Sequence, residues 1–149
     1  MSTKNNYTIA EVSKLSGLPA STLRYYETIG LIRPVERDSS SKQRVYSQQD
    51  LDRIDGIACL HATGLSLDDM RAYLENANLG TKGARGDIEL LRAQLGKLEA
   101  EEQYMKLRKQ YVRLKIQYWQ AVEMNDEATR QKNATKAKEL AQKLKFPKS

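Results

Sequence analysis

The sequence predicts a mainly α-helical protein made of one small domain and one extended element. Helix start signals and glycine stops divide residues 8–77 into short helices around a pair of extended runs. Residues 84–123 contain no proline and carry a heptad pattern of apolar side chains. A chain of 149 residues is too short for two full hydrophobic cores, so we expect one core and one long helix.

The first two helices have the spacing of a helix-turn-helix, over about residues 8–29. Thr8 and Glu11 form a capping box, so the first helix begins at Thr8, and Ser16-Gly17 ends it. The second helix follows Leu18-Pro19, runs to Ile29 and is closed by Gly30.

The second helix has one apolar and one polar face. Steps of three and four residues place Leu23, Tyr26 and Gly30 inside. The outer face then carries hydroxyl, guanidinium and phenol groups, from Ser21, Arg24, Tyr25 and Thr28. These groups bind phosphate oxygens and base edges in a DNA groove, although many small helical domains display a similar face.

Residues 31–46 predict a small hairpin, with extended runs at 31–37 and 42–46 around the serine-rich tip 38–41. The hairpin places Arg37, Lys42 and Arg44 on or near a flexible projection, as in a wing that grips the phosphate backbone. A solvated loop is the alternative.

Two further helices are expected to pack this domain. Ser47 and Asp50 cap a third helix that ends at Gly64, and Ser66 with Asp69 caps a fourth helix that ends at about Ala77. The apolar stripe of the third helix consists of Leu51, Ile54, Ile57 and Leu60.

The positive charge is unevenly distributed. Residues 1–46 carry seven Lys/Arg against four Asp/Glu, a net charge of +3, whereas residues 47–80 carry two against six, a net charge of −4. Residues 81–123 have a net charge of +3 (nine against six) and residues 124–149 of +4 (seven against three). The basic pI of 9.4 therefore reflects the C-terminal end as much as the helix-turn-helix.

The long helix is expected to dimerise. It follows a glycine-spaced hinge at 79–86 and extends to about Glu123. Its heptad seam consists of Ala84, Ile88, Leu91, Leu95, Leu98, Glu102, Met105, Lys109, Val112, Ile116 and Trp119. In an antiparallel pair of helices, Glu102 and Lys109 of the two copies would meet around a midpoint near Met105 and set the register.

A second apolar line widens the later half of this helix, so that half is expected to pack on more than one neighbour. The line consists of Tyr104, Leu107, Tyr111, Leu114, Tyr118 and Ala121. Plain packing and an aromatic-lined effector cavity are both open. Beyond Met124 the basic tail predicts a short amphipathic helix that folds back on the dimer, too short to be an effector-binding domain.

Six strings in this order carry a family resemblance: Tyr7-Thr8-Ile9-Ala10-Glu11-Val12, Ser21-Thr22-Leu23-Arg24-Tyr25-Tyr26-Glu27, Gly30-Leu31-Ile32, Arg44-Val45-Tyr46, Asp50-Leu51 and Gly64-Leu65-Ser66-Leu67. Over about residues 7–77 the chain closely resembles the DNA-binding domain of the MerR (mercury-resistance regulator) family. The resemblance implies a winged helix-turn-helix DNA-binding domain followed by a long coiled-coil dimerisation helix, which we expect to be antiparallel.

The resemblance also implies site residues. Arg24, Tyr25 and Tyr26 correspond to recognition-helix residues that contact DNA, and Arg44 and Tyr46 to the anchor of the wing. Together with the outward polar side chains, the expected DNA-binding set is Thr8, Ser21, Thr22, Arg24, Tyr25, Tyr26, Arg37, Lys42, Arg44 and Tyr46. The expected organisation is a DNA-binding domain at 1–80, a hinge and coiled coil at 81–123, and a basic tail at 124–149.

The signal that such a regulator senses is constrained by one cysteine and one histidine. No cysteine follows Cys59, so we expect no soft-metal or iron-sulfur site and no cofactor. The stretch around Cys59 resembles the aldehyde- and electrophile-responsive branch of the family, which keeps a lone cysteine there. Helical phasing turns Cys59 away from the apolar stripe, towards Asp52 and Asp55, where we expect it to be accessible; a small packing residue is the alternative.

The sequence therefore predicts a homodimeric transcription regulator on a palindromic promoter operator. The resemblance implies activation by DNA distortion, which brings in RNA polymerase through the promoter. An effector-independent architectural or excisionase-like DNA-binding protein is the alternative. We expect no enzyme, because no set of acid, base and nucleophile is present. We expect neither a membrane partner nor secretion, since Met1–Tyr7 lacks an apolar signal segment, and so place the protein in the cytoplasm, with stress response as its context.

Overall fold

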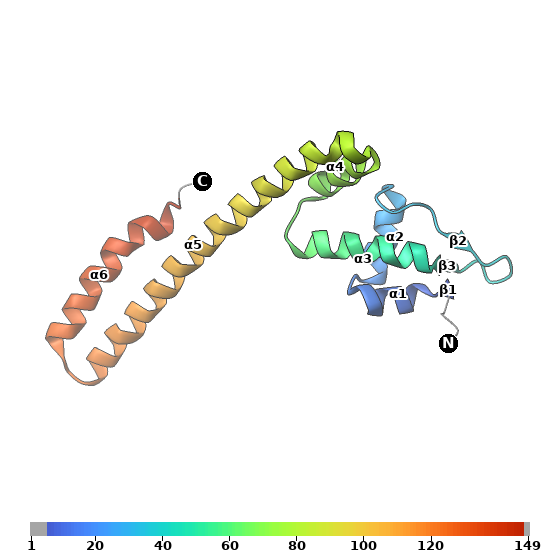
Figure 1. Cartoon of the computed structure of the whole chain (residues 1–149). Coiled ribbons are helices and arrows are strands. Elements are labelled where there is room, and N and C mark those ends of the chain that lie inside the picture. The colour runs from blue at the N-terminus through green and yellow to red at the C-terminus, as the bar shows by residue number, and fades with distance from the viewer. Residues whose placement is uncertain (1–5, 148–149) are drawn as a thin grey trace, which may run out of the picture. The chain divides into compact units, whose positions relative to one another are not determined.

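The computed structural model describes residues 6–147, which form two compact units within 1–90 and 91–149 (Figure 1). The first five residues, on which part of the secretion argument depends, lie outside the described chain. The elements are β1 (Asn6–Tyr7), α1 (Ile9–Ser16), α2 (Ala20–Thr28), β2 (Glu36–Arg37), β3 (Arg44–Ser47), α3 (Gln48–Ala62), α4 (Leu67–Asn78), the 3₁₀ turn η1 (Gly80–Gly83), α5 (Ala84–Glu123) and α6 (Glu127–Lys145).

The predicted helix caps of the first unit are confirmed. Thr8 and Ser47 both form complete capping boxes, with Glu11 and Asp50 respectively, and the Ser66 hydroxyl accepts from the Asp69 backbone N–H. Because these caps satisfy backbone donors that have no partner inside the helix, they locate the starts of α1, α3 and α4.

The core of the first unit lies under α2 and β3. Leu23, Tyr26 and Tyr46 are buried together with side chains from α1, α3 and α4, which confirms the inward face predicted for Leu23 and Tyr26. The inward position predicted for Gly30 is wrong, because Gly30 is exposed. Gly30 has a φ of +77°, and the turn lets the N–H groups of Leu31 and Ile32 both donate to the Tyr26 carbonyl.

The predicted hairpin is present, and a third strand that the sequence did not indicate joins it. β3 pairs with β2 through Glu36↔Val45 and Arg37↔Arg44, and on its other side with β1 through Tyr7↔Tyr46. The pairing of β1 fixes the chain just before the Thr8 cap, so one small sheet in the order β1-β3-β2 joins the start of α1 to the hairpin.

The segment 79–86, expected to be a hinge, is an ordered turn followed directly by helix. η1 occupies Gly80–Gly83, and α5 begins at Ala84 without an intervening coil. The helix expected from about Asp87 to Glu123 therefore begins three residues earlier and contains 40 residues, about 60 Å at about 1.5 Å per residue.

The second unit is a pair of packed helices. The tail forms α6, a helix of 19 residues, longer than the short helix expected. Its Ala137 and Leu140 pack against Leu114 of α5, with Leu107 and Tyr111 beside them, and the Tyr104 hydroxyl donates to the Leu144 carbonyl at 3.1 Å. The second apolar line of α5 is thus covered by the chain's own tail.

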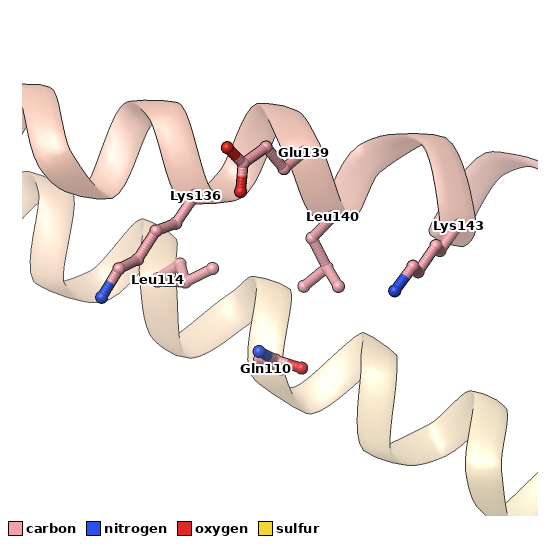
Figure 2. Close-up of a pocket in the computed structure, with 6 residues that line it drawn as sticks. All are labelled: Gln110, Leu114, Lys136, Glu139, Leu140 and Lys143. Atoms are coloured by element: carbon pink, nitrogen blue, oxygen red, sulfur yellow. The ribbon is translucent and has the colours of Figure 1, made fainter.

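A shallow hollow of about 410 Å³ lies along this helix pair, as Figure 2 shows. It is lined by Gln110, Leu114, Lys136, Glu139, Leu140 and Lys143. None of these six side chains is aromatic, and Tyr104 and Tyr111 pack against α6 instead. A second hollow of about 420 Å³ on α5 is lined in part by Tyr111, Ile116 and Trp119, so plain packing and an aromatic-lined effector cavity both stay open.

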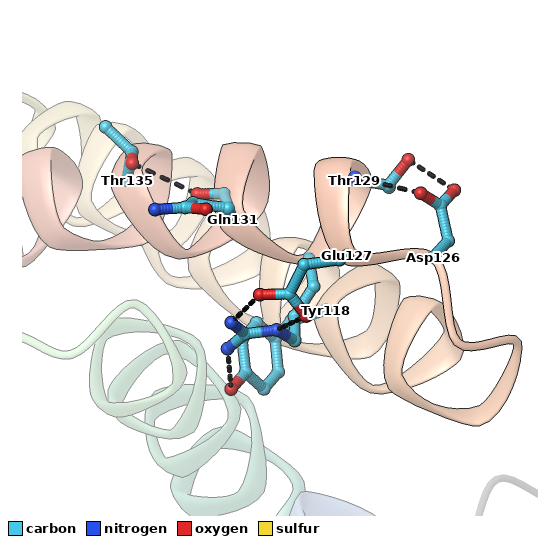
Figure 3. A network of polar contacts seen from close by, with 7 residues as sticks. Tyr118, Asp126, Glu127, Thr129, Gln131 and Thr135 are labelled. Carbon is cyan, nitrogen blue, oxygen red and sulfur yellow. Dashed lines mark hydrogen bonds and ion pairs between the residues drawn. The ribbon is translucent and has the colours of Figure 1, made fainter.

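Polar contacts hold the turn between α5 and α6 (Figure 3). Asp126 accepts from both the backbone N–H and the hydroxyl of Thr129, which lowers the pKa of this carboxyl. Arg130 of α6 pairs with Glu127 and donates to the hydroxyl of Tyr118 on α5 at 3.2 Å. This bond fixes the first turn of α6 against α5.

Within residues 6–147, no helix combines the length and the apolar character that crossing a membrane requires.

Candidate nucleic-acid interface

The outer face of α2 carries the polar side chains that the sequence placed there. Ser21, Arg24, Tyr25 and Thr28 are exposed, and Tyr25 retains 53% of its surface. Thr22 is half-buried. The Thr28 hydroxyl donates to the Arg24 carbonyl at 2.9 Å, so this hydroxyl proton is already used within the helix. The two large exposed side chains on this face are Arg24 and Tyr25.

Thr8 lies at the start of α1, where its hydroxyl oxygen accepts from the Glu11 backbone N–H at 3.2 Å. The hydroxyl proton is not used by this cap. Thr8 can therefore cap the helix and still donate a hydrogen bond to a phosphate oxygen.

Two tyrosines expected among the DNA contacts lie in the core. Tyr26 is 5% exposed and Tyr46 is 1% exposed. Burial raises the pKa of both phenols, with neighbouring Tyr25 adding to the effect on Tyr26. The burial of Tyr46 agrees with the role of wing anchor that the resemblance implies, and the DNA contacts expected of Tyr26 and Tyr46 stay predictions.

Arg44 is held by an ion pair rather than projecting freely from the wing. Its Nε donates to Glu27 Oε2 at 2.7 Å, and the two side chains are only 18% and 15% exposed. The other oxygen of Glu27 accepts from the Val35 backbone N–H at 3.4 Å. Glu27 thus joins α2 to the residue before β2 and to β3. The expected contact between Arg44 and DNA stays a prediction, which would be made by an ion-paired side chain rather than a freely projecting one.

The tip of the wing is ordered by Asp38, although the sequence predicts a flexible projection. Its carboxylate accepts from the backbone N–H groups of Ser40 and Ser41 and from the Ser40 hydroxyl. These bonds lower the pKa of Asp38 to about 2. Arg37 donates to the Lys42 carbonyl at 3.0 Å, so both exposed cations lie on a defined turn.

Two contacts that the sequence analysis did not predict hold α2 at its end and on its buried side. Arg71 of α4 donates to the Ile29 carbonyl at 2.7 Å, at the end of α2. The Tyr26 hydroxyl lies 3.4 Å from His61 Nδ1 near the end of α3. The two residues of the first contact are 42 positions apart along the chain and those of the second are 35 apart, so no local sequence pattern predicts either contact.

Cys59 is exposed on α3, as its helical phase predicts. Asp52 and Asp55 are exposed on the same helix. Cys59 also lies at a cavity of about 540 Å³ whose apolar lining includes Leu31, Ile57 and Leu74.

The seam of α5 is uncovered in the single chain. Its apolar members are between 38% and 61% exposed, with Leu98 the least exposed and Trp119 the most; they are Ile88, Leu91, Leu95, Leu98, Met105, Val112, Ile116 and Trp119. Glu102 and Lys109 are exposed within the same stripe. An exposed apolar stripe of this length, interrupted by these two charges, is typical of an interaction surface.

Comparison with known proteins identifies relatives of this architecture. The model of the MerR HTH family regulatory protein matches residues 7–77. The HTH-type transcriptional regulator AdhR of Bacillus subtilis is 46% identical over 77 residues, 52% of this chain and 52% of AdhR, so the chain spans about half of that relative. The HTH-type transcriptional regulator YyaN of the same organism is 30% identical over 112 residues, 67% of this chain and 80% of YyaN.

A solved structure resembles most of the chain. It is the crystal structure of HiNmlR, a MerR family regulator lacking the sensor domain, bound to promoter DNA. The TM-score is 0.69 at 26% sequence identity, with 83% of this chain and 95% of the other covered. The similarity therefore extends beyond the helix-turn-helix into the helical second unit.

The Glu27–Arg44 pair generates a stability prediction. Glu27→Gln keeps the size of the side chain but leaves the guanidinium of Arg44 partly buried without its counter-charge. We expect a loss of about 1–3 kcal/mol in the free energy of unfolding, measured by urea denaturation. Glu36→Gln, at an exposed carboxylate of β2, is the matched control. Equal midpoints for the two variants would show that the pair does not hold the hairpin.

Proposed function

The chain belongs to the MerR family of helix-turn-helix regulatory proteins, and from this membership we propose that it regulates transcription as a homodimer bound to a palindromic promoter operator. The observation that carries the proposal is the exposed polar face of α2, which is clamped to an ordered basic wing.

The DNA contact is supported by how α2 and the wing are held. α2 presents Arg24 and Tyr25 while its opposite side is buried, and the wing tip presents Arg37 and Lys42. A helix of this kind enters the major groove, and cations at a wing neutralise phosphates beside it. The similarity to a regulator bound to promoter DNA supports the same use of the fold.

The homodimer is supported by the uncovered seam of α5. Because α6 covers only the second apolar line, the seam keeps exposed side chains such as Leu95 and Trp119 that a second copy would bury. An antiparallel pairing brings Glu102 of one copy to Lys109 of the other. The two DNA-binding domains, joined by the paired α5 helices, would then bind half-sites about one helical turn apart. Two such half-sites related by a two-fold axis form a palindromic operator.

The proposed mode of action is activation by DNA distortion, with RNA polymerase engaged through the reshaped promoter. Distortion costs energy that many phosphate contacts must offset, which fits an interface with several fixed cations. An architectural protein without an effector would use the same interface. The two are distinguished by whether the bound operator lies between promoter elements and whether an added signal changes transcription.

The proposed signal is an electrophile that reacts at Cys59. Support comes from the exposure of the thiol on α3 and from the cavity beside it, which both apolar and charged side chains line. Attack of the thiolate on an aldehyde carbon forms a C–S bond, and the carbonyl oxygen takes a proton from water, which gives a hemithioacetal.

Removing the guanidinium of Arg24 tests the interface. On a palindromic duplex selected in vitro from random sequence, we expect Arg24→Ala to lower affinity by about 1–3 kcal/mol, because the side chain loses a base or phosphate contact. Lys132→Ala, which removes the same charge from an exposed position of α6, is the control. Titrations at several salt concentrations measure both effects. Indistinguishable isotherms for Arg24→Ala and Lys132→Ala would remove α2 as the recognition helix.

Reversing the charge of Glu102 tests the dimer register. Glu102→Lys sets lysine against the partner's Lys109, so we expect a weaker dimer in sedimentation equilibrium. The double variant Glu102→Lys with Lys109→Glu restores opposite charges and should recover the dimer. Glu89→Lys, off the seam, controls for net charge. A dimer unaffected by the single reversal contradicts the antiparallel register.

Substituting the only cysteine tests the signal. With wild type we expect a reactive aldehyde to change run-off transcription from the operator-containing promoter, and with Cys59→Ser we expect no change. Equal transcriptional responses from the two proteins would rule out the thiol as the sensor.

A further inference from the structure

The junction between α4 and α5 is closed by contacts that the helices themselves do not require. Asn76 lies in the last turns of α4, and its carbonyl accepts from the Leu79 backbone N–H at 3.0 Å. Its side-chain Nδ2 donates to Asp87 Oδ1 at 3.1 Å, in the first turn of α5. One residue therefore bonds to the turn and to the start of the long helix.

Two glycines allow this close approach. A Cβ at Gly83 would lie 1.8 Å from the Asn76 carbonyl oxygen and 2.5 Å from its carbonyl carbon, distances that no real Cβ adopts. A Cβ at Gly86 would lie 2.7 Å from Asn76 Nδ2. By contrast, Gly96 further along α5 has nothing within 4 Å of its Cβ position. The glycines at 83 and 86 thus have a packing role that Gly96 lacks.

We infer that Asn76, Gly83 and Gly86 form a rigid elbow that positions the start of α5 on α4 and thereby selects the half-site spacing that the dimer accepts. The inference rests on the proposed function, because spacing has meaning only for two copies on one duplex. These three are positioning residues, since none of them lies on the DNA-facing side of α2 or the wing.

The length of α5 makes the elbow sensitive. From Ala84 to Met105, the proposed midpoint of the seam, the helix rises about 32 Å at about 1.5 Å per residue. For a straight helix of this length, a change of roughly 10° in its direction at the elbow displaces the point at Met105 by about 5–6 Å, more than the roughly 3.4 Å rise of one base pair. A small displacement at Asn76 is therefore enough to change which operator fits.

The experiment measures the affinity of the full chain for three duplexes. One has the half-site spacing obtained in the selection, here called the natural spacing, and the other two have a spacing one base pair shorter or one base pair longer. Four proteins are compared: wild type, Gly83→Ala, Gly86→Ala and the control Gly96→Ala. We expect wild type and Gly96→Ala to prefer the natural spacing by on the order of tenfold or more.

The two elbow variants should lose or shift this preference, and Gly83→Ala should do so more strongly. Its new methyl group meets a backbone carbonyl, whereas that of Gly86→Ala meets the end of a side chain that can rotate away. Binding to a duplex with a single half-site should be unchanged in both, because α2 and the wing are untouched. A loss of stability alone would lower affinity at every spacing alike and would not move the optimum.

The outcomes separate the inference from the function on which it rests. If both elbow variants keep the wild-type spacing profile, or if Gly96→Ala shifts the profile as much as they do, the elbow is overturned while the regulator remains. A wild-type chain that binds every spacing equally contradicts the proposed dimeric function and the elbow with it. Circular dichroism checks folding, and if Gly83→Ala does not fold, the comparison of Gly86→Ala with Gly96→Ala decides.

Discussion

The ion pair between Glu27 and Arg44 is the constraint on which the interface depends. α2 has only nine residues and the hairpin only two short strands, and neither element is stable alone. Glu27 joins them, because one carboxylate oxygen binds Arg44 on β3 and the other accepts from Val35 before β2. Partly buried charges repay their desolvation only in good geometry, so the main effect of the pair is orientation. The recognition helix and the wing consequently act as one surface.

That surface is stiff because its support comes from within the domain. Leu23 and Tyr26 fix α2 to the core, while Arg71 binds the carbonyl at the end of the helix. These contacts lie on the buried side and at the end of α2, so Arg24 and Tyr25 stay exposed on its outer side, where the Tyr25 ring also contacts the Tyr26 ring. If this surface binds DNA as proposed, its geometry exists beforehand and little ordering entropy would be lost on association.

The parts of the fold predicted from the sequence are those with local causes. The capping boxes at Thr8 and Ser47, the left-handed turn at Gly30 and the heptad spacing of α5 each depend on residues a few positions apart. Strand β1, the bond from Arg71 to Ile29 and the partner of Arg44 depend on residues far apart in sequence, and no local pattern reveals them. Charge and the family resemblance both placed Arg44 in the wing, and neither indicated its ion pair with Glu27. Glycine content predicted a hinge at 79–86. Glycine permits both mobility and close packing, and only the neighbouring Asn76 decides for packing.

The two apolar faces of α5 differ in what covers them. One packs against α6 and the other is exposed, and this difference suits the helix to the proposed dimer. Toward α6 the buried core is small, with Leu114, Ala137 and Leu140, so polar contacts at both ends complete the pairing. Arg130 and Asp126 hold the turn, and Tyr104 bonds to Leu144 at the far end. Because α6 packs along the later half of α5, the exposed seam lies on a helix that is already held on another side. In the proposed dimer, a seam on a helix already packed against α6 would lose less conformational entropy on burial than the seam of an isolated helix.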